Sequence, residues 1–463
     1  MADKPGAPKH KPNRGRRPDA RAKGKPGAGP RTATAPAKPG LAARRVAVQL
    51  LRGVLEEKSQ LSDLLGAQGP LAGLDGPDRA RAQRLTVTTL RQLDRADTLL
   101  DGFMDRRPPL PALNILRLAV VELCVEGAAP HGVVDSAVSL MRKNRKAGQF
   151  TGLANAVLRK VAEEGPALWA DLPVPALPKW LRRRIVHIYD ENTVRAIEAA
   201  HLAGAPLDLT LKNERDAHAW AEKLDAELLP TGSLRIARSA QVTDLPGYDT
   251  GHWWVQDAAA AIPVRLLAPQ PGETILDLCA APGGKTLQLA AAGAKVTALD
   301  LSKSRMVRLR ENLRRTDLSA TCVTADALSW ESPEPFDSIV LDAPCSATGT
   351  IRRHPDLPHV RTGKDLDQLF QLQSDLIDRA VALLKPGGRL LYCTCSLLTE
   401  EGERQAKLAI VRHGLSEIAP DCAALGLGPE VLREGGGLRL RPDYWAERGG
   451  MDGFFMIALR KPE

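Results

Sequence analysis

The sequence is poor in aromatic residues and cysteine, and it has no long apolar segment. Aromatic residues make up 4% of its 463 positions, and its 7 cysteines are scattered along the chain. Dispersed cysteines in odd number argue against a disulfide framework, and residues 1–40 contain no apolar signal segment. The longest stretch without a charged side chain, residues 147–158, is well short of the ~18 residues of a membrane-spanning helix. We therefore expect a cytoplasmic protein with reduced thiols and no membrane segment.

Composition and charge separate a basic arm from a neutral remainder. With 43% hydrophobic and 26% charged residues, the chain has the length for about two to four globular domains. Residues 1–40 hold 11 lysines and arginines against 2 aspartates, which equals the +9 net charge of the whole chain. They contain no Val, Ile, Leu or aromatic residue, so we expect a disordered basic arm. The arm either grips nucleic-acid phosphates or keeps the protein soluble, and the sequence favours neither.

Apolar residues recur at helical spacing from residue 41 to residue 165, which predicts an all-α domain over this range. The expected helical runs are residues 46–55, 78–104, 113–126, 132–142 and 150–163. A proline-rich linker beginning at Pro166 and a small α+β subdomain would then occupy residues 166–250. Near its start, the basic cluster around Trp180 either stacks a nucleic-acid base or begins a helix with a buried tryptophan.

From residue 251 to residue 463 we expect an α/β domain with a doubly wound parallel sheet. Short apolar runs alternate with helical stretches, one of them near residues 366–384. The expected strands are residues 275–279, 295–299, 321–324, 338–341 and 389–392. Ligands of such sheets bind beyond the carboxyl ends of the strands. The chemically reactive side chains placed there are Asp300, Asp326, Asp342, Cys345 and Cys395.

The glycine turn at residues 280–284 follows the first of these strands. Gly284-Lys285-Thr286 imitates the end of a phosphate-binding loop, but such a loop needs glycine where this chain has Cys279. The turn also lacks the G-x-G-x-x-G pattern of dinucleotide sites. An acidic residue about 20 positions after the turn, here Asp300, is suited to ribose hydroxyls. A ligand with an adenosine moiety and no phosphate, such as S-adenosylmethionine, fits this pattern.

Two cysteines, Cys345 and Cys395, are candidates for a nucleophile. Carbon 5 of cytosine becomes nucleophilic when a thiolate adds to carbon 6, so an enzyme that methylates it needs a cysteine at the rim of the cofactor pocket. The alternative is that these residues, with Cys279 and Cys393, are small buried side chains. Cys393 and Cys395 lack the second pair of ligands that a structural zinc site requires, and we expect no metal.

Three segments around these residues resemble the motifs of the RNA (cytosine-5)-methyltransferases of the Nop2/Sun group. They are residues 277–286, 341–346 and 392–396. Residues 115–119, 130–138 and 155–159 resemble the NusB-type RNA-binding domain. The order of the two is that of bacterial small-subunit rRNA methyltransferases of the Sun/RsmB type. The resemblance implies a class I, Rossmann-like S-adenosylmethionine-dependent methyltransferase domain, preceded by an all-α NusB-like domain and a small α+β subdomain.

The resemblance also implies a role for each matching residue. Asp300 would bind the ribose hydroxyls, Asp326 would lie near the adenine, and Asp342 would lie between cofactor and target base. Cys395 would be the nucleophile, and Cys345 would assist release of the methylated RNA. The methionine side of the cofactor would be lined by Cys279, Ala280, Ala281, Pro282, Gly283, Gly284 and Lys285.

The expected function is therefore methylation of C5 of a cytosine in small-subunit (16S) ribosomal RNA through a covalent cysteine–C6 adduct. The expected partner is that RNA, with no membrane and no evident obligate protein partner. The alternatives are a non-catalytic RNA-binding or antitermination factor and a methyltransferase acting on tRNA or DNA. The resemblance also suggests that Arg352, Arg353 and His354 hold phosphates beside an extruded base. Basic residues between 303 and 315 form a helix face that is either solvated or bound to RNA.

Overall fold

The computed structural model describes residues 40–66, 68–237 and 241–463. The expected basic arm, residues 1–40, lies outside the described residues except for Gly40. Within the described part of the chain, no helix combines the length and the apolar character needed to cross a bilayer.

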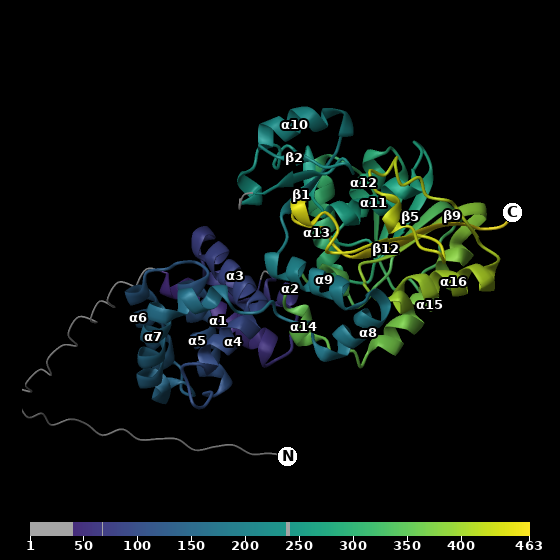
Figure 1. Cartoon of the computed structure of the whole chain (residues 1–463). Coiled ribbons are helices and arrows are strands. Elements are labelled where there is room, and N and C mark those ends of the chain that lie inside the picture. The colour runs from purple at the N-terminus through teal and green to yellow at the C-terminus, as the bar shows by residue number, and fades with distance from the viewer. Residues whose placement is uncertain (1–39, 67, 238–240) are drawn as a thin grey trace, which may run out of the picture. The chain divides into compact units, whose positions relative to one another are not determined.

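Helices make up the described part of residues 41–170, as the apolar spacing predicts (Figure 1). Their inward faces form two apolar clusters, one around Leu50 and one around Leu116. The expected run 78–104 is divided at Gln92 into two helices, and the last helix continues past Pro166, which the sequence placed in the linker. The helices are α1 (Leu41–Leu55), α2 (Leu61–Leu64), α3 (Gly76–Arg91), α4 (Leu93–Asp101), α5 (Leu110–Cys124), α6 (Pro130–Lys143) and α7 (Thr151–Ala170).

A short segment of mixed structure connects these helices to the C-terminal domain. Trp180 lies in the first turn of α8, where its ring packs over Gly363, and Arg182 forms ion pairs with Glu191 and Glu198. These contacts favour the helix interpretation of the Trp180 cluster over base stacking. The elements are α8 (Lys179–Tyr189), α9 (Glu191–Ala203), α10 (Ala217–Leu224) and an antiparallel sheet ordered β2 (Glu227–Leu228), β3 (Leu234–Ile236), β1 (Leu207–Leu211) and β4 (Trp253–Val255).

The C-terminal domain contains the expected parallel sheet, and its first five strands are those that the sequence predicts. Their order across the sheet is β7-β6-β5-β8-β9, so the chain reverses direction across the sheet between β5 and β8. The strands are β5 (Thr274–Leu278), β6 (Lys295–Asp300), β7 (Thr321–Thr324), β8 (Phe336–Asp342) and β9 (Leu384–Thr394). This sheet confirms the predicted Rossmann-like α/β class.

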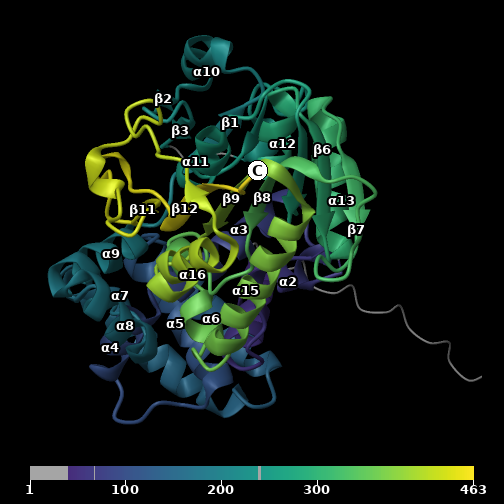
Figure 2. The same ribbon diagram turned by 90° about the vertical axis from the view of Figure 1, so that its right-hand side faces the viewer.

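Helices cover both faces of this sheet (Figure 2). On one face, Ile275, Val340 and Leu391 pack under the first two helices of the domain and Ala298 packs under the third. On the other face, Leu276 and Tyr392 pack under the last two helices. The alternation along β5 explains the division, because neighbouring strand residues point to opposite faces. The helices are α11 (Ala258–Leu267), α12 (Gly284–Ala291) and α13 (Lys303–Thr316) on one face, and α15 (Leu366–Leu383) and α16 (Glu403–His413) on the other. The short helix α14 (Leu357–Val360) precedes α15.

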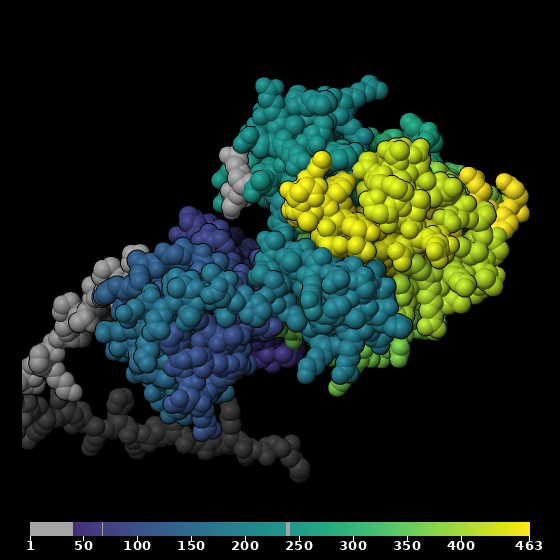
Figure 3. All heavy atoms as spheres, viewed as in Figure 1, coloured from purple at the N-terminus to yellow at the C-terminus, as the bar shows by residue number. Residues whose placement is uncertain are grey.

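Three further strands, which the sequence did not predict, complete the sheet. They are β10 (Ser416–Glu417), β11 (Leu438–Leu440) and β12 (Phe454–Arg460). β12 runs antiparallel to β9 and also pairs with β10 and β11. The loop before β12 contacts the small subdomain, since Arg235 donates a hydrogen bond of 2.8 Å to the Gly450 carbonyl (Figure 3, yellow against teal).

Candidate active site

The candidate site lies where β5, β6, β8 and β9 end. Parallel strands present their carboxyl ends at one edge, so residues far apart in sequence meet there. Asp300 is the last residue of β6, Asp342 is the last residue of β8, and Cys395 directly follows β9. Cys345 stands three positions after Asp342, in a loop held to Cys395 by a 2.9 Å hydrogen bond from the Gly349 amide.

The glycine turn between β5 and α12 folds back over β6. Cys279 has φ 61°, in the left-handed region, and this turn allows the Ala280 amide to bond the Leu299 carbonyl at 3.1 Å. Gly283 has φ 109°, and a Cβ atom there would lie 2.9 Å from Leu309. The Asp300 carboxylate accepts a 3.0 Å hydrogen bond from the Ala281 amide. The turn and the carboxylate at the end of β6 are thus one hydrogen-bonded unit.

Lys285 and Asp342 form an ion pair at the centre of the site. Lys285 Nζ lies 2.8 Å from Asp342 Oδ2, and the ammonium sits 5.1 Å from the centre of the Phe454 ring. Burial lowers the pKa of Lys285, but the charge and hydrogen bond of Asp342, together with the nearby Cys393 and Asp277, outweigh burial, and the net pKa is raised. Lys285 therefore stays charged at neutral pH and holds the Asp342 side chain in one orientation. Cys393 Sγ lies 3.7 Å from the other oxygen of the Asp342 carboxylate.

The two candidate cysteines face each other beside this pair. The Sγ atoms of Cys345 and Cys395 are 3.5 Å apart, and both side chains are partly exposed. The pKa of Cys345 is raised well above its usual value, first by the hydrogen bond to Cys395 and then by burial. Cys345 is therefore a thiol that can donate its proton toward the Cys395 sulfur. The sequence placed these two residues at one edge of the sheet, and the structure brings them into contact.

Asp277 is buried behind the glycine turn and is not fully partnered. Its Oδ2 accepts a 2.6 Å hydrogen bond from Thr286, whereas Oδ1 has no hydrogen-bond partner among the described residues. Burial raises the pKa of Asp277 to about 7. A cofactor with an amino group and ribose hydroxyls fits this region, because Asp277 offers an unused acceptor and Asp300 a fixed carboxylate.

Asp326 lies after β7, apart from the hydrogen-bonded residues at the centre of the site. It is exposed, and its carboxylate accepts a 3.0 Å hydrogen bond from the Leu328 amide. No hydrogen bond or ion pair within the described ranges joins it to the Lys285–Asp342 pair or to the cysteines. Its position at the strand end leaves its side chain available to a ligand at this edge of the sheet.

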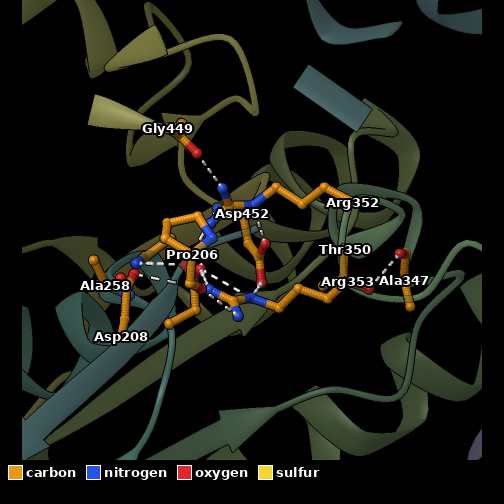
Figure 4. A network of polar contacts seen from close by, with 12 residues as sticks. Pro206, Asp208, Ala258, Ala347, Thr350, Arg352, Arg353, Gly449 and Asp452 are labelled. Atoms are coloured by element: carbon orange, nitrogen blue, oxygen red, sulfur yellow. Dashed lines mark hydrogen bonds and ion pairs between the residues drawn. The ribbon is translucent and has the colours of Figure 1, made fainter. Parts of the chain in front are cut away.

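The structure shows that the prediction for Arg352 and Arg353 was wrong (Figure 4). Arg352 is 0% exposed, and its guanidinium lies 2.6 Å from both Asp257 and Asp452. Arg353 contacts the same two carboxylates. Both guanidinium groups thus form ion pairs with carboxylates of this protein and are not free to bind an RNA phosphate. His354 is exposed, but partial desolvation by its neighbours lowers its pKa, so the imidazole carries no positive charge for a phosphate at neutral pH.

Sequence reasoning also missed Glu401, which lies beneath both cysteine loops. Its carboxylate accepts hydrogen bonds from the residues that directly follow the two cysteines, Ser346 and Ser396. The only available signal was the serine after each cysteine, because the sequence does not show that both hydroxyls reach one carboxylate.

The sheet order with an antiparallel last strand, the glycine turn after the first parallel strand and the acidic strand ends together define a class I methyltransferase. Residues 264–460 match the family model described as 16S rRNA methyltransferase RsmB/F, and residues 41–163 match that of the NusB family. The chain belongs to the RsmB/F methyltransferase family.

Individual relatives agree over most of the chain. It is 37% identical over 413 residues to Ribosomal RNA small subunit methyltransferase B of Sodalis glossinidius, covering 83% of this chain and 93% of that protein. The protein of the same name from Pseudomonas putida is 36% identical over 443 residues, or 90% and 98% of the two chains.

Solved structures support the fold. The crystal structure of PH0851 superposes with a TM-score of 0.71 at 23% identity and covers 92% of this chain and 99% of its own. A methyltransferase homolog protein from Pyrococcus horikoshii gives a TM-score of 0.51 at 27% identity, over 61% of this chain and 95% of that one.

Proposed function

We propose that the protein uses S-adenosylmethionine to methylate C5 of a cytosine in 16S ribosomal RNA, and that Cys395 forms a covalent bond to C6 during the reaction. The observation that carries the proposal is the pair of cysteine sulfurs 3.5 Å apart, beside the Lys285–Asp342 ion pair at the carboxyl ends of adjacent strands. The names of its relatives and the RsmB/F family match support ribosomal RNA as the substrate.

The cofactor would lie along the glycine turn, and it supplies an electrophilic methyl group on a sulfonium. Asp300 would accept hydrogen bonds from the ribose hydroxyls, and Asp326 would lie near the adenine. Asp342 would separate cofactor and base, held by Lys285. The residues that would line the methionine part are Cys279, Ala280, Ala281, Pro282, Gly283, Gly284 and Lys285.

The two cysteines would act in different steps, Cys395 in the addition to C6 and Cys345 in the removal of the C5 proton. After losing its proton to solvent, Cys395 Sγ would add to C6 as a thiolate, and the electron pair of the C5–C6 double bond would move to C5. C5 would then bond the methyl group while the methyl–sulfonium bond breaks and leaves its electron pair on the cofactor sulfur. The proton on C5 must then leave before the C6–sulfur bond breaks. The largest cause of the raised pKa of Cys345 is its contact with Cys395. Because that sulfur becomes a thioether in the adduct, the Cys345 thiol would lose its proton to water more easily at this stage and would accept the C5 proton as a thiolate. The C5–H electron pair would re-form the C5–C6 double bond while the C6–sulfur bond breaks and releases Cys395 as a thiolate.

We also propose that the chain is organised as an RNA-binding NusB-like domain over residues 41–165, a linker and subdomain over 166–250 and a catalytic domain over 251–463. The basic arm would precede them. Ribosomal RNA as substrate supports a cytoplasmic location.

The test uses the wild type, Cys395→Ala and Cys345→Ala with unmodified 16S rRNA, tRNA or duplex DNA and radiolabelled S-adenosylmethionine. Wild type should methylate the rRNA at a cytosine C5. Cys345→Ala should accumulate a covalent protein–RNA band on a denaturing gel, and Cys395→Ala should give neither band nor product. Methylation by Cys395→Ala would refute the assigned nucleophile. Preference for tRNA or DNA would refute the substrate, and failure of wild type to bind S-adenosylmethionine would support a non-catalytic RNA-binding factor.

A further inference from the structure

We propose that Glu401 is a positioning residue that sets the distance between the two cysteine sulfurs. This role rests on the proposed function, because Glu401 would act in the covalent steps of the methylation. The contacts that support it are present in the protein without RNA or cofactor.

Glu401 ends a short helical turn, Thr399–Glu401, that follows the Cys395 loop, and its side chain is 0% exposed. One carboxylate oxygen accepts the Ser346 amide at 2.8 Å. The other accepts the hydroxyls of Ser346 and Ser396, each at 2.5 Å. Since these serines directly follow Cys345 and Cys395, one carboxylate ties the two cysteine loops together.

The carboxylate is itself fixed from two further directions. Gln373, on α15, donates a 3.0 Å hydrogen bond to it and another of 3.0 Å to the Pro344 carbonyl, next to Cys345. The main-chain carbonyl of Glu401 accepts a 2.6 Å hydrogen bond from the Tyr392 hydroxyl at the end of β9. Glu401 is therefore held by the strand and the helix that flank the site, which makes it a rigid support for both loops.

The chemistry of this position favours a carboxylate for a specific reason. Within the described ranges, no lysine or arginine forms an ion pair with Glu401, so hydrogen bonds compensate its buried position. A carboxylate offers two accepting oxygens, whereas an amide offers one and adds two donors. Glutamine would fill the same space, but its single oxygen could replace only one of the two carboxylate oxygens. If it accepts the two serine hydroxyls, its NH₂ group faces the Ser346 amide and the Gln373 side-chain NH₂, which are both donors. An apolar residue would leave four donors of the surrounding loops and of Gln373 without this acceptor, so the carboxylate is what joins the two loops.

Glu401→Gln is the main test variant, and Glu400→Gln is its matched control. Glu400 is the neighbouring residue of the same turn, but it pairs with Arg184, and among the described residues it forms no hydrogen bond or ion pair with either cysteine loop. With the full-length enzyme and 16S rRNA, we expect Glu401→Gln to lower kcat about tenfold or more, with KM for RNA and the affinity for S-adenosylmethionine changed less than about twofold. Rates are divided by the concentration of sites that bind S-adenosylmethionine, so partial unfolding does not mimic the effect.

A second readout requires no methyl transfer. Diamide, a diazene oxidant, converts the two thiols to a disulfide, taking up their two electrons and two protons as it becomes the hydrazine. The Cys345–Cys395 disulfide, measured by peptide mass spectrometry, should form about tenfold more slowly in Glu401→Gln than in wild type and Glu400→Gln. Equal rates in all three proteins would overturn the proposal, as would a kcat per cofactor-binding site within about twofold of wild type.

If Glu401→Gln does not fold, the double variant Ser346→Ala/Ser396→Ala removes the two hydroxyl donors to Glu401, together with the acceptor of the Leu398 amide, and should give the same two losses. If wild type forms the disulfide but does not methylate RNA, the proposed function fails while the positioning role is still decided by the disulfide rates. A double variant that retains both wild-type rates would overturn the positioning role.

Discussion

Replacement of Asp277 by asparagine should remove a loss of folding stability that the wild type suffers as the pH rises. Asp277 is 0% exposed, and one of its carboxylate oxygens has no hydrogen-bond partner among the described residues. Burial raises its pKa from 3.8 to about 7. Asparagine has nearly the same shape as the protonated carboxyl and carries no charge, so it keeps the packing and removes the titration.

The magnitude follows from the two pKa values. Between about pH 4 and about pH 7 the folded state binds a proton at Asp277 that the unfolded chain has released, so stability falls as pH rises through this window. The two pKa values differ by about 3, and each unit corresponds to about 1.36 kcal/mol. The protonated Asp277 therefore contributes about 4 kcal/mol to the free energy of unfolding at low pH, and this contribution is fully lost above about pH 7. The stability of Asp277→Asn relative to wild type should therefore increase by about 4 kcal/mol from pH 4 to pH 8.

Urea unfolding of the cofactor-free proteins at several pH values from about 4 to about 8 measures this difference. Asp337→Asn is an informative control, because hydrogen bonds from Lys385 and Thr274 lower the pKa of Asp337 to about 2. Its substitution should cost more stability at high pH than at low pH, which is the opposite sign. A difference between Asp277→Asn and wild type that is constant with pH, or that decreases as pH rises, would refute the reasoning.

Three other substitutions test the surroundings of the site. Gly349→Ala would place a Cβ atom 2.1 Å from the Gly453 carbonyl oxygen and should cost about 3 kcal/mol in urea unfolding, whereas Gly435→Ala, with nothing within 4 Å, should be nearly neutral. Arg352→Met leaves two buried carboxylates without their main partner and should lower stability by about 3–5 kcal/mol; an unchanged urea midpoint would contradict the role of the ion pairs. Asp300→Asn should weaken S-adenosylmethionine binding in calorimetry by about tenfold, and an unaltered Kd would remove it from the cofactor site.

The sequence predicted most of the parallel strands well because they are short apolar runs followed closely by an acidic residue or a glycine turn. β9 differs, since it begins at Leu384 and not at the expected Arg389 and ends at Thr394, before Cys395. The third expected strand, Thr321–Thr324, agrees with β7 at both ends, and the expected helix 366–384 agrees with α15 within one residue. The antiparallel strands β10 to β12 escaped prediction because their pairing depends on partners that lie far away in the sequence.

Site residues could be predicted from the sequence when their type is chemically reactive and they follow directly after a predicted strand. Cys345 and Cys395 are examples, since two strand ends at one edge bring them together. Arg352 was misassigned because its partners, Asp257 and Asp452, lie about a hundred residues away on either side, and a loop arginine without visible partners resembles a free cation. Glu401 was missed for the same reason, since its contacts are made across three elements.

The position of β12 has a consequence for how the enzyme is made. β12 lies between β9 and β10, although it is synthesised after both, so the edge of the sheet beside the Cys395 loop cannot close until residue 460 has left the ribosome. Helices α1 to α7 pack mainly with one another and depend on much earlier synthesis. The chain should therefore fold its N-terminal helices first and complete its methyltransferase domain last. Messages with a stop codon between the end of α7 and the start of β12 should yield proteins with folded N-terminal helices and no methyltransferase activity.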